Sequence, residues 1–404
     1  MNLNVICDDG TILKHEIVKE KFTDKLLKNK IGYIGTQSKE SNALNIFSAY
    51  FSESKAILLD ETNRSIVELL KQLNVQSFES DNSENTLFDD KDFSLMYFTS
   101  GSTGYPVAAL KSKENIISEV NALSLLLEKY TIKKVIITVP FIHLYGTLFG
   151  LMYPLMNNVD IYLKEHFLPN DILEMIDDYT MVVTTPLYIK ALNKLTQKKD
   201  LSKSIFISST APLNHESIVM FKEKYKADIM QIFGSTETGG IAHKLNDETS
   251  WIPFNGVEIS SNEKDELKVR SPFVSDILYE EGFKNTRGEI QTFDYVELEQ
   301  DTFKLIGRSS KIFKLAGKRY STVQIENILE NIEGITKALV FVEMAKDSLR
   351  GEYLDITIES DQVFLAKDIK KILQHKLSNL KFSIKLKIVK EIPINQTGKK
   401  LRIK

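Results

Sequence analysis

Short apolar runs rich in β-branched residues alternate with helical patterns through most of the chain, and this alternation limits the possible folds more than any other feature. Runs such as KKVIITVP, MVVTTP, SIFISST and ADIMQIFG have the length of buried strands and end in turn residues. Segments such as residues 115–130, with apolar residues at helical spacing, stand between them. The pattern predicts an α/β fold with largely parallel sheets, helices on their faces and ligands at the carboxyl ends of the strands.

The pattern changes from Asp265 onward, where DELKVRSP, EIQTFDYVEL and TFKLIGR indicate a small, more antiparallel β subdomain. After Arg308, a capping box at 321–324 opens a predicted helix. KALVFVEM, LDITIES and SIKLKIVKEI then have the pattern of strands, with a second helix expected at 368–377. We therefore expect a large domain at 1–308 and a small α+β domain at 309–404.

Composition agrees with more than one domain, because a chain of 404 residues exceeds what one hydrophobic core usually fills. The 52 basic and 55 acidic residues give a net charge of −3, which offers no electrostatic surface for nucleic acid. The single cysteine, Cys7, rules out an internal disulfide. The N-terminus lacks the basic start and unbroken apolar stretch of a secretory signal, so we expect a cytoplasmic protein.

Residues 135–156 form a stretch with the length and apolar character of a membrane span. Pro140, His143, Gly146 and Pro154 interrupt this stretch at turn positions. A strand, a loop and a helix explain it better, and we expect no stable membrane insertion.

The stretch LMYFTSGSTGYPVAALKS contains a cluster of glycine and hydroxyl residues suited to phosphate, since glycines let backbone N–H groups approach an anion and hydroxyls add donors. The cluster comprises Thr99, Ser100, Gly101, Ser102, Thr103 and Gly104. The loop is not a Walker A motif, because the lysine that ends such a motif is absent, and the same absence argues against a kinase. A plain flexible linker is the alternative.

A second turn of this kind occurs in QIFGSTETGG, where a predicted strand runs into hydroxyl residues and Glu237. Mg²⁺ in nucleotide sites takes oxygen ligands and commonly only one or two carboxylates. Glu237 is therefore a candidate metal ligand, and the alternative is a solvated turn with this side chain in water.

These motifs resemble, in order and spacing, those of the adenylate-forming superfamily, which includes acyl- and aryl-CoA synthetases, nonribosomal peptide adenylation domains and luciferases. YFTSGSTGYP is similar to the phosphate-loop signature, and IFGSTET to the Tyr-Gly-x-Thr-Glu motif with Phe233 in the tyrosine's place. The family's order also holds for PFIHLYG, SSTAPL, DELKVRSP, QTFDYV, LIGRSSKIFKLAGKRYSTVQIE and IPINQTGKKLR. The resemblance covers the chain from Ser94 to its end and implies an abbreviated part before Ser94.

The resemblance implies a two-step reaction. A carboxylic acid attacks the α-phosphate of ATP to give an acyl-adenylate and pyrophosphate, and the acyl group then passes to a phosphopantetheine thiol. That thiol would belong to coenzyme A or to a separate acyl carrier protein, since the sequence shows no carrier domain of its own. Because two anions must meet in the first step, cations and hydrogen-bond donors, Mg²⁺ among them, would supply most of the catalysis.

The resemblance also assigns nucleotide contacts. The phosphate loop would hold the β- and γ-phosphates, Thr236 would donate to the α-phosphate, and Glu237 would bind Mg²⁺. Phe233 would lie against the adenine, while Asp294 and Arg308 would bind the ribose hydroxyls. The other positions of the expected nucleotide site are Ser209, Ala211, Pro212, Gly234 and Ser235.

Lys399, in the motif NQTGKKLR, matches the family lysine that bridges the substrate carboxylate and the α-phosphate, and Lys400 is the competing candidate. His143 matches a histidine near the acyl pocket, the alternative being a satisfied core residue. Lys314 and Arg319 keep the basic character expected near phosphate or the pantetheine tunnel. The small domain would be mobile, rotating between the half-reactions on a hinge within residues 308–314.

The chain departs from the family pattern at both the phosphate loop and the hinge. Val107 stands where the loop usually carries lysine, so that Lys111 is the nearest replacement cation. Ser310 and Lys311 replace the usual hinge residues. These departures keep open a second hypothesis, a non-catalytic relative that binds nucleotide or acyl ligand as a regulator or scaffold.

The sequence indicates little about the acid or the oligomeric state. Amino-acid-activating relatives usually carry an aspartate just after phenylalanine, whereas Ile142 follows Phe141, so an amino acid is disfavoured. Gly239 and Gly240 are expected to leave room for a ring or a chain in the acid pocket.

Overall fold

The computed structural model describes residues 1–35, 38–80, 85–100, 106–308, 312–315, 318–344, 352–376, 383–394 and 400–402. The chain forms two compact units: the first unit is Met1–Ile259 with Val269–Ile290, and the second unit is Ser260–Lys268 with Gln291–Lys404. A boundary at Arg308 stays a prediction, since it concerns where the small domain would hinge. Of the expected site residues, only the backbone is described for Thr99, Ser100, Arg308, Lys314 and Arg319.

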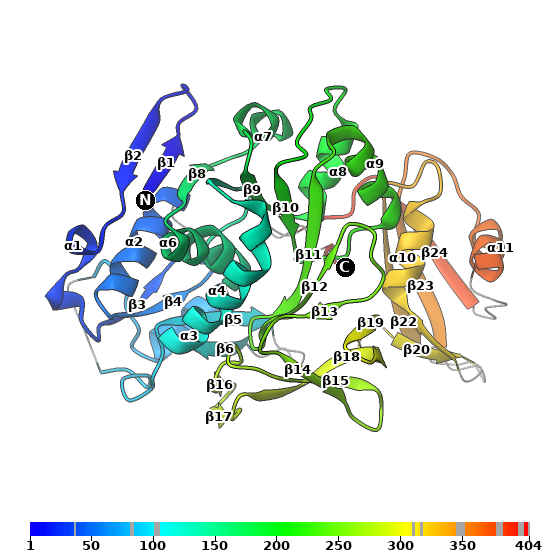
Figure 1. Cartoon of the computed structure of the whole chain (residues 1–404). Helices are drawn as coiled ribbons and strands as arrows, with labels where there is room; N and C mark the ends of the chain where they lie inside the picture. Colours follow the sequence, from blue (N-terminus) through cyan, green and yellow to red (C-terminus); the bar gives the residue numbers. More distant parts are fainter. Residues whose placement is uncertain are drawn as a thin grey trace. The chain divides into compact units, whose positions relative to one another are not determined.

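The first unit contains a nine-stranded sheet (Figure 1). Its spatial order is β13 (Ile252–Pro253), β12 (Gly239–Leu245), β11 (Asp228–Ser235), β10 (Ile205–Ser208), β9 (Thr180–Thr184), β7 (Lys134–Ile137), β8 (Asp160–Lys164), β1 (Asn2–Ile6) and β2 (Ile12–Glu16). Neighbours from β11 to β1 pair in parallel, and antiparallel strands lie at both edges. The four runs that predicted buried strands are β7, β9, β10 and β11, which confirms the parallel sheet.

Alternate side chains of this sheet enter two different cores, as expected when helices cover both faces. On one face, Val182 and Phe206 pack with helices α7 (Pro169–Met175), α8 (Pro186–Lys194) and α9 (His215–Tyr225). On the other, Val183 and Ile207 belong to the core that includes residues of α2 (Lys39–Phe51) and α4 (Lys113–Leu127). The first unit also contains α1 (Lys19–Phe22) and α3 (Arg64–Gln72).

A six-stranded sheet completes the first unit. Its order is β17 (Phe283–Asn285), β16 (Ile277–Tyr279), β6 (Pro106–Lys111), β5 (Leu95–Ser100), β4 (Lys55–Leu58) and β3 (Ile31–Ile34). Strands β3, β4 and β5 are parallel, and β6, β16 and β17 are antiparallel to their neighbours. Sequence patterns predicted the helix near residue 115 but no strand before it, whereas the chain first returns along β5 as β6 and only then enters α4.

Residues 135–156 fold as a strand, a loop and a helix, as predicted. After β7, the helical part runs through α5 (Leu144–Thr147), a π-helical turn at Leu148–Met152 and α6 (Tyr153–Asn157). Throughout the described residues, no helix has both the length and the apolar character needed to cross a membrane.

A four-stranded sheet joins β14 (Glu258–Ser261), β15 (Glu266–Arg270), β18 (Glu289–Glu299) and β19 (Thr302–Arg308), which confirms the predicted antiparallel β subdomain. A hairpin follows, formed by β20 (Ile312–Leu315) and β21 (Lys318–Ser321).

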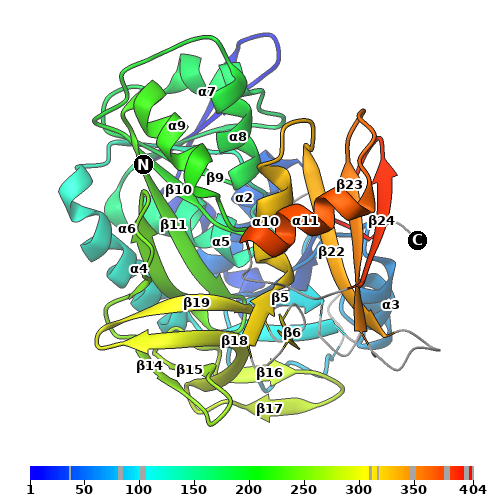
Figure 2. The ribbon, with the colours of Figure 1, turned by 90° about the vertical axis from the view of Figure 1, so that its right-hand side faces the viewer.

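The C-terminal part of the second unit is a small α+β structure (Figure 2). Its sheet contains β22 (Lys337–Met344), β23 (Glu352–Glu359) and β24 (Ser383–Val389). Ile325 and Leu329 of α10 (Thr322–Glu330), together with Ile369 and Leu373 of α11 (Ala366–Lys376), form its core with the sheet. The architecture thus matches the predicted fold class.

Candidate functional site

The turn that carries Glu237 joins β11 to β12, where the sheet changes from parallel to antiparallel pairing. Ser235 and Thr238 close the turn with reciprocal hydrogen bonds: Ser235 N–H donates to the Thr238 hydroxyl (3.0 Å), and Thr238 N–H donates to the Ser235 hydroxyl (3.2 Å). Thr236 and Glu237 lie between them and are partly exposed. The local sequence therefore fixes the backbone of the turn and leaves these two side chains at its outer end.

Phe233, the residue expected against adenine, is half-buried near the end of β11. Its ring centroid lies 5.5 Å from that of Trp251, with the planes tilted by 48°. The ammonium of Lys244 lies 4.9 Å from the Trp251 ring centroid. An aromatic pair with an accompanying cation is a suitable platform for a planar ligand.

The loop that follows β10 carries the other expected adenine contacts. Ser209 donates a hydrogen bond to the carbonyl of Ile232 (3.0 Å), which ties the loop to β11, while Ala211 and Pro212 are exposed. Thr210 has φ +79°, a left-handed conformation that is uncommon for threonine and occurs mostly at functional sites and turns. The structure thus places this loop beside the Phe233 strand, at the carboxyl edge of the sheet.

Two buried polar atoms at the same edge, Ser208 Oγ and Gln231 Nε2, have no hydrogen-bond partner among the described atoms. Ser208 and Gln231 are Cα partners across β10 and β11. Buried polar groups in proteins nearly always form hydrogen bonds. At this edge of the sheet, these two groups can therefore form hydrogen bonds with a polar ligand or with water.

The phosphate-loop motif forms a β-hairpin. Thr99 pairs with Val107 and Ser100 with Pro106 across β5 and β6. Gly101, Ser102, Thr103 and Gly104 lie outside the described residues, so their phosphate contacts stay predictions. Val107 lies in a strand beside the expected loop.

Lys111 does not serve as the replacement cation of the phosphate loop. Its side chain is buried, with the residue 1% exposed, at the end of β6. Its ammonium donates to the carbonyls of Phe273 (2.5 Å) and Glu237 (3.3 Å). The expectation that Lys111 takes over the phosphate contact was wrong, because these long-range contacts commit its ammonium to the protein interior.

Glu119, which sequence reasoning missed, lies buried beside this lysine. From α4 its Oε1 accepts the N–H of Gly240 at 2.6 Å. Burial raises the pKa of the Glu119 carboxyl, and the Lys111 cation opposes that shift. Burial likewise lowers the pKa of Lys111, opposed chiefly by Glu119. The signal that could have found Glu119 is its position among Ile116, Val120 and Leu123 on the apolar face of the helix.

The two glycines after the turn do not open space for an acid. A β-carbon on Gly240 would lie 2.7 Å from Cε2 of Phe254, and the space beside Gly239 is filled by Glu119 and Phe273. The expected room for a ring or chain at these positions is thus occupied by the protein's own side chains.

His143 precedes α5 and is half-buried. Burial lowers the pKa of its imidazole, and the charge of Asp60 opposes that shift only in part. The imidazole is therefore neutral at neutral pH and suited to accept or donate a hydrogen bond. Its expected place near an acyl pocket stays a prediction.

In the second unit, the expected ribose-binding residues occupy neighbouring strands. Asp294 on β18 is the Cα partner of Arg308 on β19, and Asp294 is 5% exposed. Lys314 and Arg319 are likewise Cα partners, across the β20–β21 hairpin. Each pair that the sequence motifs singled out is thus brought together by the backbone.

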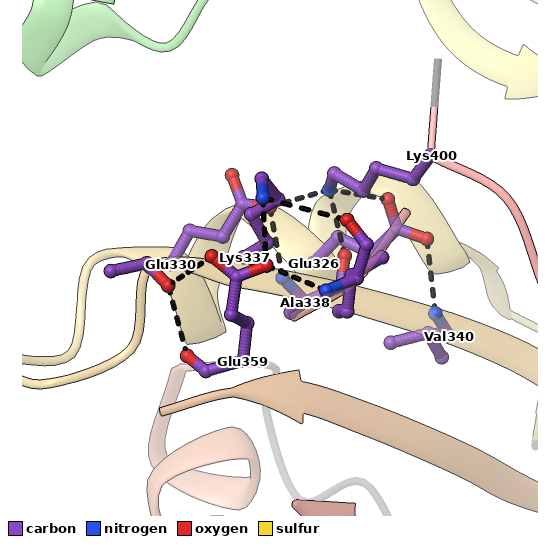
Figure 3. A network of polar contacts seen from close by, with 9 residues as sticks. Glu326, Glu330, Lys337, Ala338, Val340, Glu359 and Lys400 are labelled. Atoms are coloured by element: carbon purple, nitrogen blue, oxygen red, sulfur yellow. Dashed lines mark hydrogen bonds and ion pairs between the residues drawn. The ribbon is translucent and has the colours of Figure 1, made fainter. Parts of the chain in front are cut away.

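Lys399 lies outside the described residues, but its neighbour Lys400 is held in a polar network of the second unit (Figure 3). The Lys400 ammonium binds the carboxylates of Glu326 (3.2 Å) and Glu330, and donates to the carbonyl of Ala338 (2.7 Å). The two glutamate side chains are 6% and 8% exposed. Because these groups engage its ammonium, Lys400 is less suited than Lys399 to contact a substrate.

Both ends of the segment that contains Lys399 are fixed in the second unit. Lys400 forms a bridge with Ile394, and at the preceding end Ile392 N–H donates to Glu359 at 2.7 Å. Lys337 donates to the same Glu359 oxygen at 2.7 Å (Figure 3). These carboxylates therefore anchor residues on either side of the expected catalytic lysine.

The donor groups present limit how the protein could bind a metal ion. Among the described residues, no group of three or more histidine, cysteine, aspartate or glutamate side chains gathers to hold a metal ion. Glu237 on its fixed turn fits the other common arrangement, in which one carboxylate shares Mg²⁺ with phosphate and water oxygens.

A comparison with protein families matches a model described as AMP-binding enzyme to residues 29–266. Probable 4-coumarate–CoA ligase 1 of Dictyostelium discoideum is 26% identical over 353 residues, which span 77% of this chain and 62% of that protein. 2-Succinylbenzoate–CoA ligase of Oceanobacillus iheyensis is 25% identical and covers 87% and 78% of the respective chains. 3,4-Dihydroxybenzoate–[aryl-carrier protein] ligase of Bacillus anthracis is 22% identical, covering 87% and 85%.

The fold also matches solved structures over nearly the whole chain. The o-succinylbenzoate coenzyme A synthetase of Bacillus subtilis, in complex with ATP and magnesium ion, has a TM-score of 0.81 and 15% sequence identity. The match covers 98% of this chain and 94% of that one. At this identity the likeness establishes the fold alone.

Proposed function

Because the chain belongs to the AMP-binding enzyme family, we propose that it is an acid–thiol ligase that activates a carboxylic acid with ATP. In the first step the acid displaces pyrophosphate from ATP and forms an acyl-adenylate. In the second step a phosphopantetheine thiol takes the acyl group and releases AMP.

The single observation that carries this proposal is the Ser235–Thr238 turn. Its backbone is closed by its own hydroxyl groups, and its carboxylate, Glu237, stands at the carboxyl edge of a parallel sheet. Ligands of α/β sheets bind at that edge. A carboxylate and hydroxyl donors at this place match what a magnesium nucleotide requires.

We assign Glu237 as the residue that holds Mg²⁺. When bound, the ion supplies positive charge that neutralises the phosphates. Thr236, the preceding residue of the turn, would donate to the α-phosphate. The remaining charge would be met by Lys399, whose ammonium would bridge the acid and the α-phosphate.

The proposed nucleoside contacts are the following. In the first unit, Phe233 and the exposed loop 209–212 would contact the adenine. In the second unit, Asp294 would accept hydrogen bonds from the ribose hydroxyls, beside Arg308. His143, neutral at physiological pH, would lie near the acyl group without adding charge.

The acyl acceptor is proposed to be coenzyme A or a separate carrier protein. Relatives named for either acceptor align with most of this chain. The acceptors share the phosphopantetheine thiol, and this shared chemistry is all that the proposal requires.

The test is ATP–pyrophosphate exchange across a panel of aliphatic and aromatic carboxylic acids, with Lys399→Ala as the control. We expect at least one acid to support exchange and the alanine variant to lose most of it. If the protein binds ATP but no acid supports exchange, the ligase proposal fails and a non-catalytic nucleotide-binding role takes its place. Addition of coenzyme A to an active pair then tests the acceptor.

A further inference from the structure

Lys111 and Glu119 are two buried side chains of opposite charge that the proposed chemistry leaves unused. They come from adjacent elements, the end of β6 and the middle of α4. Lys111 is 1% exposed and Glu119 is 3% exposed. Charged side chains are rarely buried to this extent without a specific role.

The contacts of this pair converge on the backbone of the turn that carries Glu237. The Lys111 ammonium donates to the Glu237 carbonyl at 3.3 Å, and the N–H of Ser275 donates to the same carbonyl at 2.9 Å. At the other end, Glu119 accepts the N–H of Gly240 at 2.6 Å. The stretch from residue 237 to residue 240 is therefore held at both ends by side chains of β6 and α4.

We propose that Lys111 and Glu119 are positioning residues for Glu237, fixing its backbone so that the carboxylate is presented to Mg²⁺. The inference rests on the proposed function, in which Glu237 is the metal ligand. Lys111, the lysine nearest the phosphate loop, would thus support the turn that carries the metal ligand and would not contact the phosphates. The expected effect is on the binding of magnesium nucleotide, more than on binding of the nucleoside.

Burial disfavours the charge on both side chains. The Glu119 carboxylate, followed by those of Glu237 and Asp276, favours the charged form of Lys111, and the Lys111 cation favours the charged form of Glu119. Removing one member leaves an uncompensated buried charge, whereas replacing both by apolar residues of similar volume is often well tolerated. The informative variant is therefore the double substitution Lys111→Leu/Glu119→Leu.

A built-in probe is available to measure binding. The chain has one tryptophan, Trp251, whose ring centroid lies 5.5 Å from that of Phe233. Its fluorescence can be titrated with AMP, with ATP in EDTA and with ATP in Mg²⁺. The ratio of the last two dissociation constants gives the gain in ATP affinity due to Mg²⁺, without any turnover.

We expect the double variant to reduce this Mg²⁺-dependent gain at least fivefold and to leave AMP affinity within twofold of the wild type. Lys199→Leu is the matched control, because the Lys199 ammonium also donates to two carbonyls, those of Leu173 and Ile176, but away from the turn. It should leave both quantities unchanged.

An unchanged Mg²⁺-dependent gain in the double variant would overturn the proposal. An equal loss of AMP and ATP affinity would also overturn it, since that result indicates general damage to the site. Should the leucine pair not fold, Lys111→Met/Glu119→Gln removes the same charges with closer shapes and is judged by the same two criteria. Failure of the wild type to bind ATP at all would instead reject the proposed function.

Discussion

A β-carbon on Gly239 would lie 2.6 Å from Oε2 of Glu119, and Gly239 itself has φ +73°. Both the backbone angle and the packing exclude a side chain there. We therefore expect Gly239→Ala to lower the free energy of unfolding by about 2–4 kcal/mol through backbone strain and overpacking. Chemical denaturation measures this loss.

The matched control is Gly282→Ala. No atom lies within 4 Å of the β-carbon that this change adds. Its effect on the free energy of unfolding should stay within about 0.5 kcal/mol. Similar changes in the free energy of unfolding for the two variants would contradict the tight packing described around Gly239.

Asp294 offers a test of the proposed ribose contacts. Replacing it with alanine removes a charged acceptor, and a hydrogen bond to a charged group contributes about 1.5–3 kcal/mol. We expect Asp294→Ala to weaken AMP and ATP affinity by roughly tenfold or more, as measured by Trp251 fluorescence. Asp294→Asn should lose less, because it keeps one oxygen acceptor. Equal affinity in wild type and alanine variant would reject the ribose assignment.

Lys400→Met should destabilise the second unit, since it leaves Glu326 and Glu330 buried without their shared cation. Breaking a buried pair costs ~3–5 kcal/mol, and we expect a loss near the lower end because the lysine side chain is 23% exposed. Lys400→Arg should recover part of that loss. Chemical denaturation measures the free energy of unfolding of the two variants and the wild type. A Met variant as stable as the wild type would contradict the anchoring role of Lys400.

The contacts of Glu359 predict that the stability of the folded protein depends on pH. Burial raises the pKa of its carboxyl, but hydrogen bonds from Ile392, Lys337 and Thr336 outweigh burial, so the pKa lies below the ordinary value of 4.5. As the pH falls below 4.5, the unfolded chain therefore binds a proton at this residue before the folded protein does. The stabilisation is complete above that pH and is lost as the pH drops through the folded pKa.

The measurement is the free energy of unfolding of wild type and Glu359→Gln over a range of pH. The variant should be less stable near neutral pH, and the difference should shrink in acid below pH 4.5. A difference that stays constant through this window would show that the carboxylate is not specifically stabilised.

Much of the fold could be predicted because its central strands are short β-branched runs bounded by turn residues. Strand β6 escaped prediction, since PVAALK combines proline and alanines of low strand propensity. Its strand character comes from pairing with β5 on one side and β16 on the other. Pairing with a segment far along the chain leaves no local signal.

The candidate site divides in the same way. The sequence predicted Glu237 on a turn, and the resemblance named Asp294 and Arg308 as joint ribose contacts. In the structure the turn joins β11 to β12, and Asp294 and Arg308 are Cα partners on β18 and β19. The role of Lys111 could not be predicted, since its contact with Phe273 spans 162 positions of the chain. The contacts of Lys399 stay predictions.

The burial of Lys111 and Glu119 has a consequence for how such a chain can evolve. A cation at the tip of an exposed hairpin can be exchanged in a single mutation, because water replaces its contacts. Two opposite charges sealed in the interior cannot be exchanged singly, since each intermediate carries a lone buried charge. The two positions should therefore be inherited, and lost, as a unit, so that lysine and glutamate at these positions would together mark the descent of one lineage within the family.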